Sequence, residues 1–268
     1  MGQVLPRMAS QTYFVKPDRI FIVRHGQSVG NADKTVYKDT PDYALTLTPN
    51  GHQQAETAGV IIKSIIGPEQ SIQFYISPFW RSRQTYAGIR KSFPISDSNL
   101  YKFYEDPRLR EQEWGQNMDT RGDIGFIEKI EEYRDSYGHF YYRFKDGGES
   151  CADVFDRVSD FMNTMHRDFQ KKDFPRNVVI VTHGMTMRLF LMRWFHSSVE
   201  DFESWGNPPN GGFFLLERGN DEKYNLVTPL RIHKIRHSFQ FQVPEGQMGF
   251  FPPQHELPYE TQPGHSSN

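Results

Sequence analysis

The sequence has a single cysteine among 268 residues, which excludes a disulfide framework and any cysteine-based zinc or iron–sulfur site. It also lacks long apolar runs: no stretch approaches the ~18 consecutive apolar residues of a membrane-spanning helix. Charge of one sign is not in excess, because 31 Lys and Arg balance 33 Asp and Glu. These features argue against nucleic-acid and membrane partners. One cysteine also fits a reducing compartment, so we expect a cytoplasmic protein.

The two ends of the sequence lack the periodicity of packed elements. Residues 1–17 show no regular pattern, and residues 238–268 are rich in proline and end in polar residues. We therefore expect an N-terminal extension (1–17), one domain (18–237) and a proline-rich C-terminal tail (238–268). The oligomeric state is not predicted.

Three short β-rich runs stand out, at 20–23, 72–76 and 178–181. The first and third are continuously apolar, which is typical of central strands covered on both faces. Two later runs, 213–217 and 224–227, predict an antiparallel hairpin at a sheet edge. With helices between the strands, the sequence predicts an α/β fold: a three-layer α/β/α sandwich with a mostly parallel central sheet.

The intervening helices have clear starting signals. Thr48 followed by Pro49 reads as an N-cap with proline at the first helical position. Ser150 can cap a longer helix whose apolar residues recur on one face, at Val154, Val158, Phe161, Met162, Met165 and Phe169. A further helix is expected from Met185 to about Phe195.

Basic side chains follow each of the three runs. Arg24 and His25 follow the first, Arg81 comes soon after the second, and His183 follows the third. Since the carboxyl ends of parallel strands line one edge of a sheet, these four groups should converge. The arrangement suits a phosphoryl group. The sequence has no glycine-rich P-loop and no carboxylate cluster for Mg²⁺, so we expect side chains to hold the phosphate, without metal or cofactor.

The motifs around these residues resemble the histidine phosphatase superfamily, also called the phosphoglycerate mutase-like family, in its branch with the Arg-His-Gly motif. The matching segments occur in family order over about residues 18–190. They are Arg24-His25-Gly26-Gln27-Ser28 with Asn31, Leu47-Thr48 with Gly51, Ser77-Pro78-Phe79-Trp80-Arg81, Leu109-Arg110-Glu111 with Gly115, Gly147-Gly148-Glu149-Ser150, and Val181-Thr182-His183-Gly184.

The resemblance implies a phosphoglycerate mutase-like fold and a role for each motif residue. His25 would be the nucleophile that forms a phosphohistidine, and Glu111 the acid and base. Arg24, Arg81 and a protonated His183 would bind the phosphoryl oxygens. Further substrate contacts are expected from Asn31, Gln27, Ser28, Gly184 and Arg143. As an acid near neutral pH, Glu111 needs a raised pKa.

Several residues have competing interpretations. Glu105 and Glu113 compete with Glu111 as the acid, although the glycine four residues after Glu111 matches the family spacing. Arg83 is interpreted as a surface or ion-pair arginine. It lies two positions after Arg81, so on a helix the two side chains point to different faces. His233 and His237 could share a helix face as metal ligands, but no third ligand is evident nearby.

The stretch before the Gly-Glu-Ser turn has two readings. Its aromatic strip at 140–144 could be mere packing, or, as in sugar-phosphate phosphatases of this family, it could form the substrate side of the pocket through Arg143. We expect a lid insertion at about 119–145 that selects the substrate.

The resemblance leaves the reaction open. A metal-independent phosphomonoester hydrolase acting on a small phosphorylated metabolite is favoured. The stretch 33–46 lacks the Phe-x-Gly-Trp element of cofactor-dependent phosphoglycerate mutases. The segment 109–115, Leu-Arg-Glu-Gln-Glu-Trp-Gly, also differs from the acid-loop sequence of those mutases. Such a mutase-type phosphotransferase is the alternative. A non-catalytic phosphate-binding scaffold is a third interpretation. The presence of both His25 and Glu111 argues against it, because loss of either would indicate a protein without activity.

Overall fold

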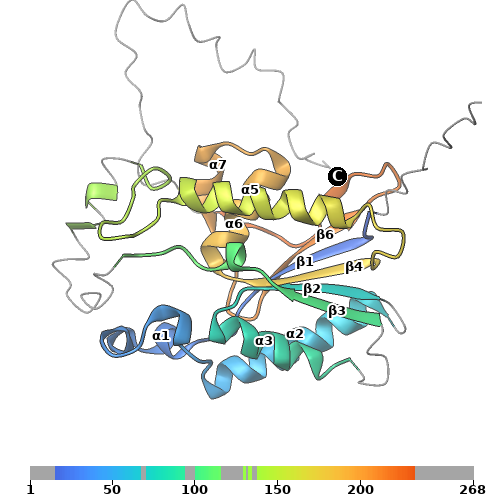
Figure 1. Ribbon diagram of the computed structural model, residues 1–268, viewed down its shortest axis with the longest axis horizontal. Coiled ribbons are helices and arrows are strands. Elements are labelled where there is room, and N and C mark those ends of the chain that lie inside the picture. The colour runs from blue at the N-terminus through green and yellow to red at the C-terminus, as the bar shows by residue number, and fades with distance from the viewer. Residues whose placement is uncertain are drawn as a thin grey trace, which may run out of the picture. The chain divides into compact units, whose positions relative to one another are not determined.

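A six-stranded sheet with strand order β3-β2-β4-β1-β6-β7 forms the centre of the fold (Figure 1). Strands β1 to β4 are parallel, whereas β6 runs antiparallel to β1 and pairs with β7 in a hairpin at the edge. The mostly parallel sheet and the edge hairpin are thus confirmed. The strands are β1 (Arg19–Arg24), β2 (Ile72–Ile76), β3 (Tyr101–Glu105), β4 (Asn177–Thr182), β6 (Phe213–Arg218) and β7 (Tyr224–Leu226), with β5 (Trp205–Gly206) and β8 (Arg231–Ile232) pairing separately.

The structure is a computed structural model that describes residues 16–67, 71–93, 100–115, 129–130, 132–134 and 138–232. All of these belong to one compact unit, Met1–Ile235. The expected tail lies outside the described residues, as do most of the expected lid and all but two residues of the expected N-terminal extension. Within the described part of the chain, no helix is long and apolar enough to cross a membrane.

The burial of each strand follows from its side chains. Residues 20–23 of β1 and 178–181 of β4 are completely buried, as their continuous apolar character predicts. The sequence pattern does not predict β3, Tyr101–Glu105, whose residues are mostly exposed. Among the described residues this strand pairs with β2 alone, at the sheet edge. An edge strand with exposed side chains does not require the continuous apolar sequence of a central strand.

The two best-marked helices begin where the sequence predicts. In α2 (Pro49–Ile66) the Thr48 side chain accepts a hydrogen bond from the Gly51 amide. In α5 (Cys151–Asp168) Ser150 and Asp153 form a reciprocal capping box. The remaining helices are α1 (Val29–Ala32), α3 (Trp80–Arg90), α6 (Gly184–Phe195), α7 (Val199–Ser204) and the 3-10 turns η1 (Lys34–Lys38), η2 (Asp42–Ala44) and η4 (Pro107–Leu109).

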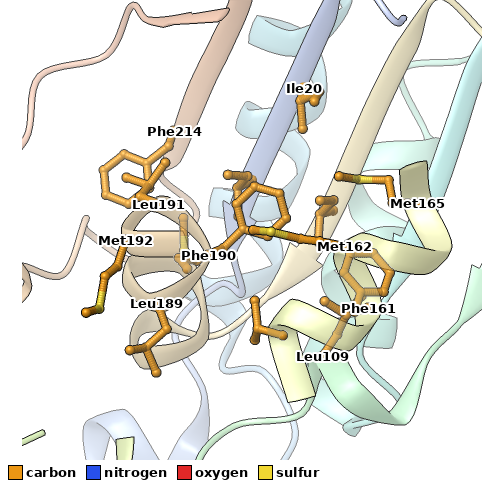
Figure 2. Close-up of a cluster of buried hydrophobic side chains, with 14 of the residues drawn as sticks. Ile20, Leu109, Phe161, Met162, Met165, Leu189, Phe190, Leu191, Met192 and Phe214 are labelled. Carbon is orange, nitrogen blue, oxygen red and sulfur yellow. The ribbon is translucent and has the colours of Figure 1, made fainter. Parts of the chain in front are cut away.

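Helices cover both faces of the sheet, which completes the three layers (Figure 1). On one face, Ile62 of α2 and Ile89 of α3 pack with Phe21 of β1. On the other, α5 and α6 bury a larger cluster that includes Phe161 and Phe190 (Figure 2). Each fully buried side chain of this size contributes about 1.5–3 kcal/mol to folding. The predicted α/β/α sandwich is confirmed.

The parallel register places three motifs at one edge of the sheet. Arg24 at the end of β1 is paired with Thr182 at the end of β4, and Ile76 at the end of β2 with Val181. The backbone amide of His25 continues the ladder to the Thr182 carbonyl at 3.0 Å. The residues that follow these strands therefore emerge side by side.

Candidate active site

Two buried histidines lie at the centre of this edge. The ring centroids of His25 and His183 are 5.2 Å apart, and the two residues are 3% and 0% exposed. They come from positions 158 residues apart in sequence and meet because β1 and β4 are neighbours. The convergence predicted from the strand ends is present in the structure.

His25 presents an unprotonated nitrogen. Its Nδ1 lies 2.7 Å from the Gly26 carbonyl oxygen, and because a carbonyl can only accept, Nδ1 carries the proton and Nε2 keeps its lone pair. Arg81 donates through Nε to this Nε2 at 3.2 Å. Burial holds the pKa of His25 well below its usual range, and the positive charges of Arg81 and Arg24 lower it further. A neutral imidazole in this setting can act as a nucleophile.

Glycine is required where the first motif passes the start of α2. A Cβ on Gly26 would lie 2.2 Å from the Gly51 carbonyl oxygen, and one on Gly51 would lie 2.1 Å from the Gln27 carbonyl oxygen. Both clashes would be with backbone atoms, so no change of side-chain rotamer could relieve them. The two glycines therefore allow the close backbone approach that fixes the loop after His25.

The two arginines differ in how they are held. Arg24 is partly buried and donates to the Pro208 carbonyl at 2.7 Å, while its buried Nε has no hydrogen-bond partner in the described part of the chain. Arg81, in the first turn of α3, is only 4% exposed. Its two terminal nitrogens bind the Asp42 carboxylate at 3.1 Å each, and one of them also donates to the Asp42 carbonyl at 2.6 Å. The Asp42 carboxylate thus occupies both terminal nitrogens of the Arg81 guanidinium.

His183 occupies the N-cap position of α6. Its Nε2 lies 2.8 Å from the Ser77 hydroxyl and 3.4 Å from that of Ser82. Its buried Nδ1 finds no partner among the described residues. Burial and the nearby charges, Arg81 first, hold the pKa of His183 well below its usual range. The free site therefore holds a neutral His183, whereas the sequence interpretation relied on the protonated form; an anion beside the ring would raise the pKa again.

Glu111 follows η4 and is partly buried. Burial raises its pKa above that of an ordinary glutamate and Asp42 adds to this effect; Arg81, Arg24 and a hydrogen bond from the Gln112 amide at 3.1 Å oppose it. A raised pKa is what the sequence argument requires of an acid near neutral pH.

The competing carboxylates have different surroundings. Glu105 pairs with Arg83 at 2.6 Å, which agrees with the ion-pair role expected for that arginine. Burial also raises the pKa of Glu113, but the charges acting on it belong first to Arg110 and Glu149. The charges that act on the pKa of Glu111 include those of Arg24 and Arg81, which are not among the causes that shift the pKa of Glu113. The electrostatics therefore associate Glu111, rather than Glu113, with the arginines beside His25 and His183.

The other expected substrate contacts vary. Asn31 accepts hydrogen bonds from the Ser28 amide and from Asn210, which leaves its amide nitrogen unused by the described residues. Ser28 is the N-cap of α1 and forms a reciprocal capping box with Asn31. The Gln27 side chain accepts a hydrogen bond from the Thr48 hydroxyl at 2.9 Å. Gly184 begins α6, where its amide has no intrahelical partner.

Arg143 is not brought to the histidines by any contact seen here. It is exposed and pairs with Asp153 at the start of α5. In the aromatic strip, Phe140 is buried against Phe202, and Phe144 packs edge-on to Trp114 at 4.8 Å. Packing therefore accounts for these two phenylalanines.

The possible metal ligands His233 and His237 lie outside the described residues. Within the described ranges, no group of three or more His, Cys, Asp or Glu side chains is arranged to hold a metal ion.

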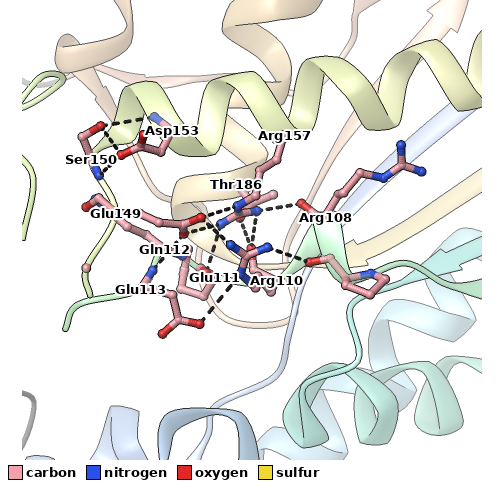
Figure 3. A network of polar contacts seen from close by, with 12 residues as sticks. Arg108, Arg110, Glu111, Gln112, Glu113, Glu149, Ser150, Asp153, Arg157 and Thr186 are labelled. Carbon is pink, nitrogen blue, oxygen red and sulfur yellow. Dashed lines mark hydrogen bonds and ion pairs between the residues drawn. The ribbon is translucent and has the colours of Figure 1, made fainter. Parts of the chain in front are cut away.

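Sequence reasoning missed three residues around the site, Asp42, Asn210 and Arg157, and quoted Glu149 only as part of the Gly-Glu-Ser turn, without a role. Asp42 binds Arg81, and Asn210 donates to the His25 carbonyl at 3.2 Å and to Asn31 at 3.0 Å. Arg157 and Glu149 fasten the loop that carries Glu111 (Figure 3). For Arg157 a signal was available, since it lies beside Val154 and Val158 on the buried edge of a helix, where an arginine needs a partner.

Comparison with known proteins agrees with this arrangement. The sequence matches the profile described as "Histidine phosphatase superfamily (branch 1)" over residues 20–228. It is 40% identical over 222 residues to phosphoglycerate mutase-like protein AT74 of Arabidopsis thaliana, covering 79% of this chain and 68% of that protein. It is 29% identical over 305 residues to broad-range acid phosphatase DET1 of Saccharomyces cerevisiae, covering 80% and 90%.

Among solved structures, the fold is similar to that of a putative α-ribazole-5′-P phosphatase from Escherichia coli. The TM-score is 0.62 and the sequence identity 16%, and the match covers 81% of this chain and 97% of the other. At this identity the likeness concerns the fold alone.

Proposed function

Because the chain belongs to the histidine phosphatase superfamily, branch 1, and is a phosphatase, we propose that it hydrolyses small phosphomonoesters through a phosphohistidine on His25, without a metal ion. One observation carries this proposal. The Nε2 of His25 is unprotonated and faces the Arg81 guanidinium at 3.2 Å, and the ring centroids of His25 and His183 are 5.2 Å apart.

In the first step, Nε2 of His25 attacks phosphorus as the P–O bond to the alcohol breaks. Glu111, protonated because its pKa is raised, gives its proton to the leaving oxygen. The products are the free alcohol, a phosphohistidine and a glutamate anion.

In the second step, Glu111 takes a proton from water as the oxygen attacks phosphorus and the P–N bond breaks. Inorganic phosphate leaves, and both His25 and Glu111 return to their starting forms. No electron is gained or lost, so the cycle needs no further reactant.

The remaining groups stabilise the phosphoryl oxygens. Arg24 supplies a forked donor, whereas Arg81, whose terminal nitrogens Asp42 already holds, supplies its positive charge beside Nε2 of His25. The Nδ1 of His183, which has no partner among the described residues, supplies a further donor once the anion raises its pKa. The amide nitrogen of Asn31, which no described residue uses, and the first amide of α6, at Gly184, can donate to the same phosphoryl oxygens. The substrate roles of Gln27, Ser28 and Arg143 stay predictions.

Small metabolites are the proposed substrates, and the name of the similar broad-range acid phosphatase supports a phosphatase that accepts varied substrates. The single cysteine, Cys151, is buried and free, which supports the proposed cytoplasmic location. A phosphoglycerate mutase-type reaction is the second candidate, favoured by the name of the relative that is 40% identical.

A phosphate-release screen tests the proposal. Sugar phosphates, phosphoglycerates, nucleotides and phosphopeptides are each incubated with the protein in EDTA, with His25→Ala as the control. We expect metal-independent release of phosphate from one or more small esters, absent in the variant. Isomerisation of 3-phosphoglycerate that is faster than phosphate release would support the mutase. Inactivity toward every ester, or a metal requirement, would contradict the proposal.

A further inference from the structure

Arg157 lies in the second turn of α5 and points toward the loop that carries Glu111 (Figure 3). Its side chain is only 10% exposed. One terminal nitrogen donates to the backbone carbonyls of Arg108 at 2.6 Å and Arg110 at 3.0 Å, and the other donates to the carbonyl of Glu111 at 3.0 Å. A single guanidinium therefore holds three carbonyls of one loop.

The carboxylate of Glu149, the glutamate of the Gly-Glu-Ser turn, holds the same guanidinium in place. Both carboxylate oxygens of Glu149 accept from Arg157, at 2.9 and 3.0 Å. Glu149 also accepts from the Glu113 amide at 3.0 Å, and its own carbonyl accepts from the Gln112 side chain at 2.8 Å. These bonds fix the two residues that directly follow Arg157's contacts with the loop.

The loop is also tied to the elements that carry His183. The hydroxyl of Thr186 in α6 donates to the Arg110 carbonyl at 2.8 Å, and that of Thr182 in β4 donates to the Leu109 carbonyl at 2.7 Å. The Arg110 carbonyl thus receives both Thr186 and Arg157. The backbone just before Glu111 is positioned relative to the histidine pocket by side chains on three separate elements.

The Glu111 carboxyl itself is bound differently. It takes part in no ion pair within the described part of the chain, and its one hydrogen bond comes from the amide of the next residue. The backbone of Glu111 is therefore fixed while its side chain remains available to a leaving group. A proton transfer works only at hydrogen-bond distance, so a small displacement of this backbone would impair it.

We propose that Arg157, held by Glu149, is a positioning residue that places Glu111 for proton transfer to the leaving oxygen. This inference rests on the proposed hydrolysis through His25. It assigns Arg157 no contact with substrate. A purely structural arginine would instead contribute to folding and affect every substrate alike.

Substrates with different leaving groups separate these two roles. An alkyl phosphate releases a poor leaving group that needs the proton of Glu111, whereas p-nitrophenyl phosphate releases a stable phenolate that does not. The ratio kcat/KM reports only the steps up to release of the alcohol, so hydrolysis of the phosphoenzyme does not obscure it. Loss of positioning should therefore appear in kcat/KM for the alkyl ester alone.

The experiment compares Arg157→Lys with Glu111→Gln and with a matched control, Arg108→Lys. Arg108 also links this loop to α5, through Asp160 at 2.6 Å, but donates to none of the loop carbonyls. We expect Arg157→Lys to lower kcat/KM for an alkyl phosphate by about tenfold or more, with less than about threefold change for p-nitrophenyl phosphate. Glu111→Gln should show the same pattern more strongly, and Arg108→Lys should show neither effect.

Equal losses on both substrates, or no loss, would overturn the positioning role while leaving the proposed hydrolysis intact. A wild-type protein that cleaves neither ester would instead contradict the hydrolysis itself. If Arg157→Lys does not fold, as judged by its thermal melting, Glu149→Gln gives the same test. That variant keeps the side-chain shape and removes the charge that fixes Arg157, so it should show the same selective loss.

Discussion

Asp42 holds both terminal nitrogens of Arg81 while the Nε of that arginine donates to His25. The carboxylate sets the orientation of the guanidinium and offsets its charge in the free site. An incoming phosphoryl group therefore meets an arginine that is already aligned, but also a negative charge beside it. Both effects have measurable consequences.

Replacing Asp42 by Asn keeps the shape of the side chain and removes its charge. We expect phosphate and vanadate to inhibit the variant more tightly, by about fivefold, because one repulsive charge near the anion is worth on the order of 1 kcal/mol. Inhibition constants at pH 7 measure this. Asp39→Asn, an exposed neighbour, is the control and should change nothing. Unchanged or weaker inhibition would show that Asp42 does not act against the anion.

The pH dependence of kcat/KM should reflect two shifted groups. His25 must be neutral, and since its pKa is lowered, activity is lost only well below pH 6.5. Glu111 must be protonated, so kcat/KM for an alkyl phosphate should fall as pH rises through the raised pKa of Glu111. Burial raises that pKa most and Asp42 adds to the rise, whereas Arg81, a hydrogen bond from the Gln112 amide and Arg24 lower it.

Two controls separate the fall at high pH from ionisation of the substrate itself. Glu111→Gln should lack it, and p-nitrophenyl phosphate should show little of it because its leaving group needs no proton. The same decline with both esters would exclude Glu111 as the acid.

His183 should gain a proton when an anion binds. Its buried Nδ1 has no partner in the described part of the chain, and a phosphoryl oxygen would provide one. We expect phosphate or vanadate to raise the pKa of His183, because the anion's negative charge favours the protonated ring. Nuclear magnetic resonance of ¹⁵N-labelled imidazoles, with His183→Ala to assign the signal, measures the shift. An unchanged titration would mean that this ring does not bind the anion.

The sequence predicts the fold and much of the site because simple rules apply to them. Continuous apolar runs identify β1 and β4, and parallel strands bring the residues after their ends together, so His25 and His183 are expected to meet. Strand β3 escapes prediction because its residues are mostly exposed and lack an apolar run.

Asp42 and Arg157 could not be placed from the sequence for a different reason. Asp42 lies in a short irregular stretch with other aspartates, and only the three-dimensional path of η2 shows which one reaches Arg81. The helix pattern marks Arg157 as an arginine that needs a buried partner, but its partners are largely backbone carbonyls, which the sequence does not identify. The state of His183 depends on burial by distant residues, which no local pattern reports.

The most direct test of the account is to trap the phosphoenzyme. An active substrate carrying labelled phosphate is mixed with the protein, and the reaction is stopped in alkaline detergent. We predict a protein-bound label that is stable in base and released by acid, as phosphohistidine is, and that is absent from His25→Ala. His166→Ala, which changes an exposed histidine, should still be labelled. Label that persists in His25→Ala, or an active wild-type protein that never carries label, would contradict the nucleophilic role of His25.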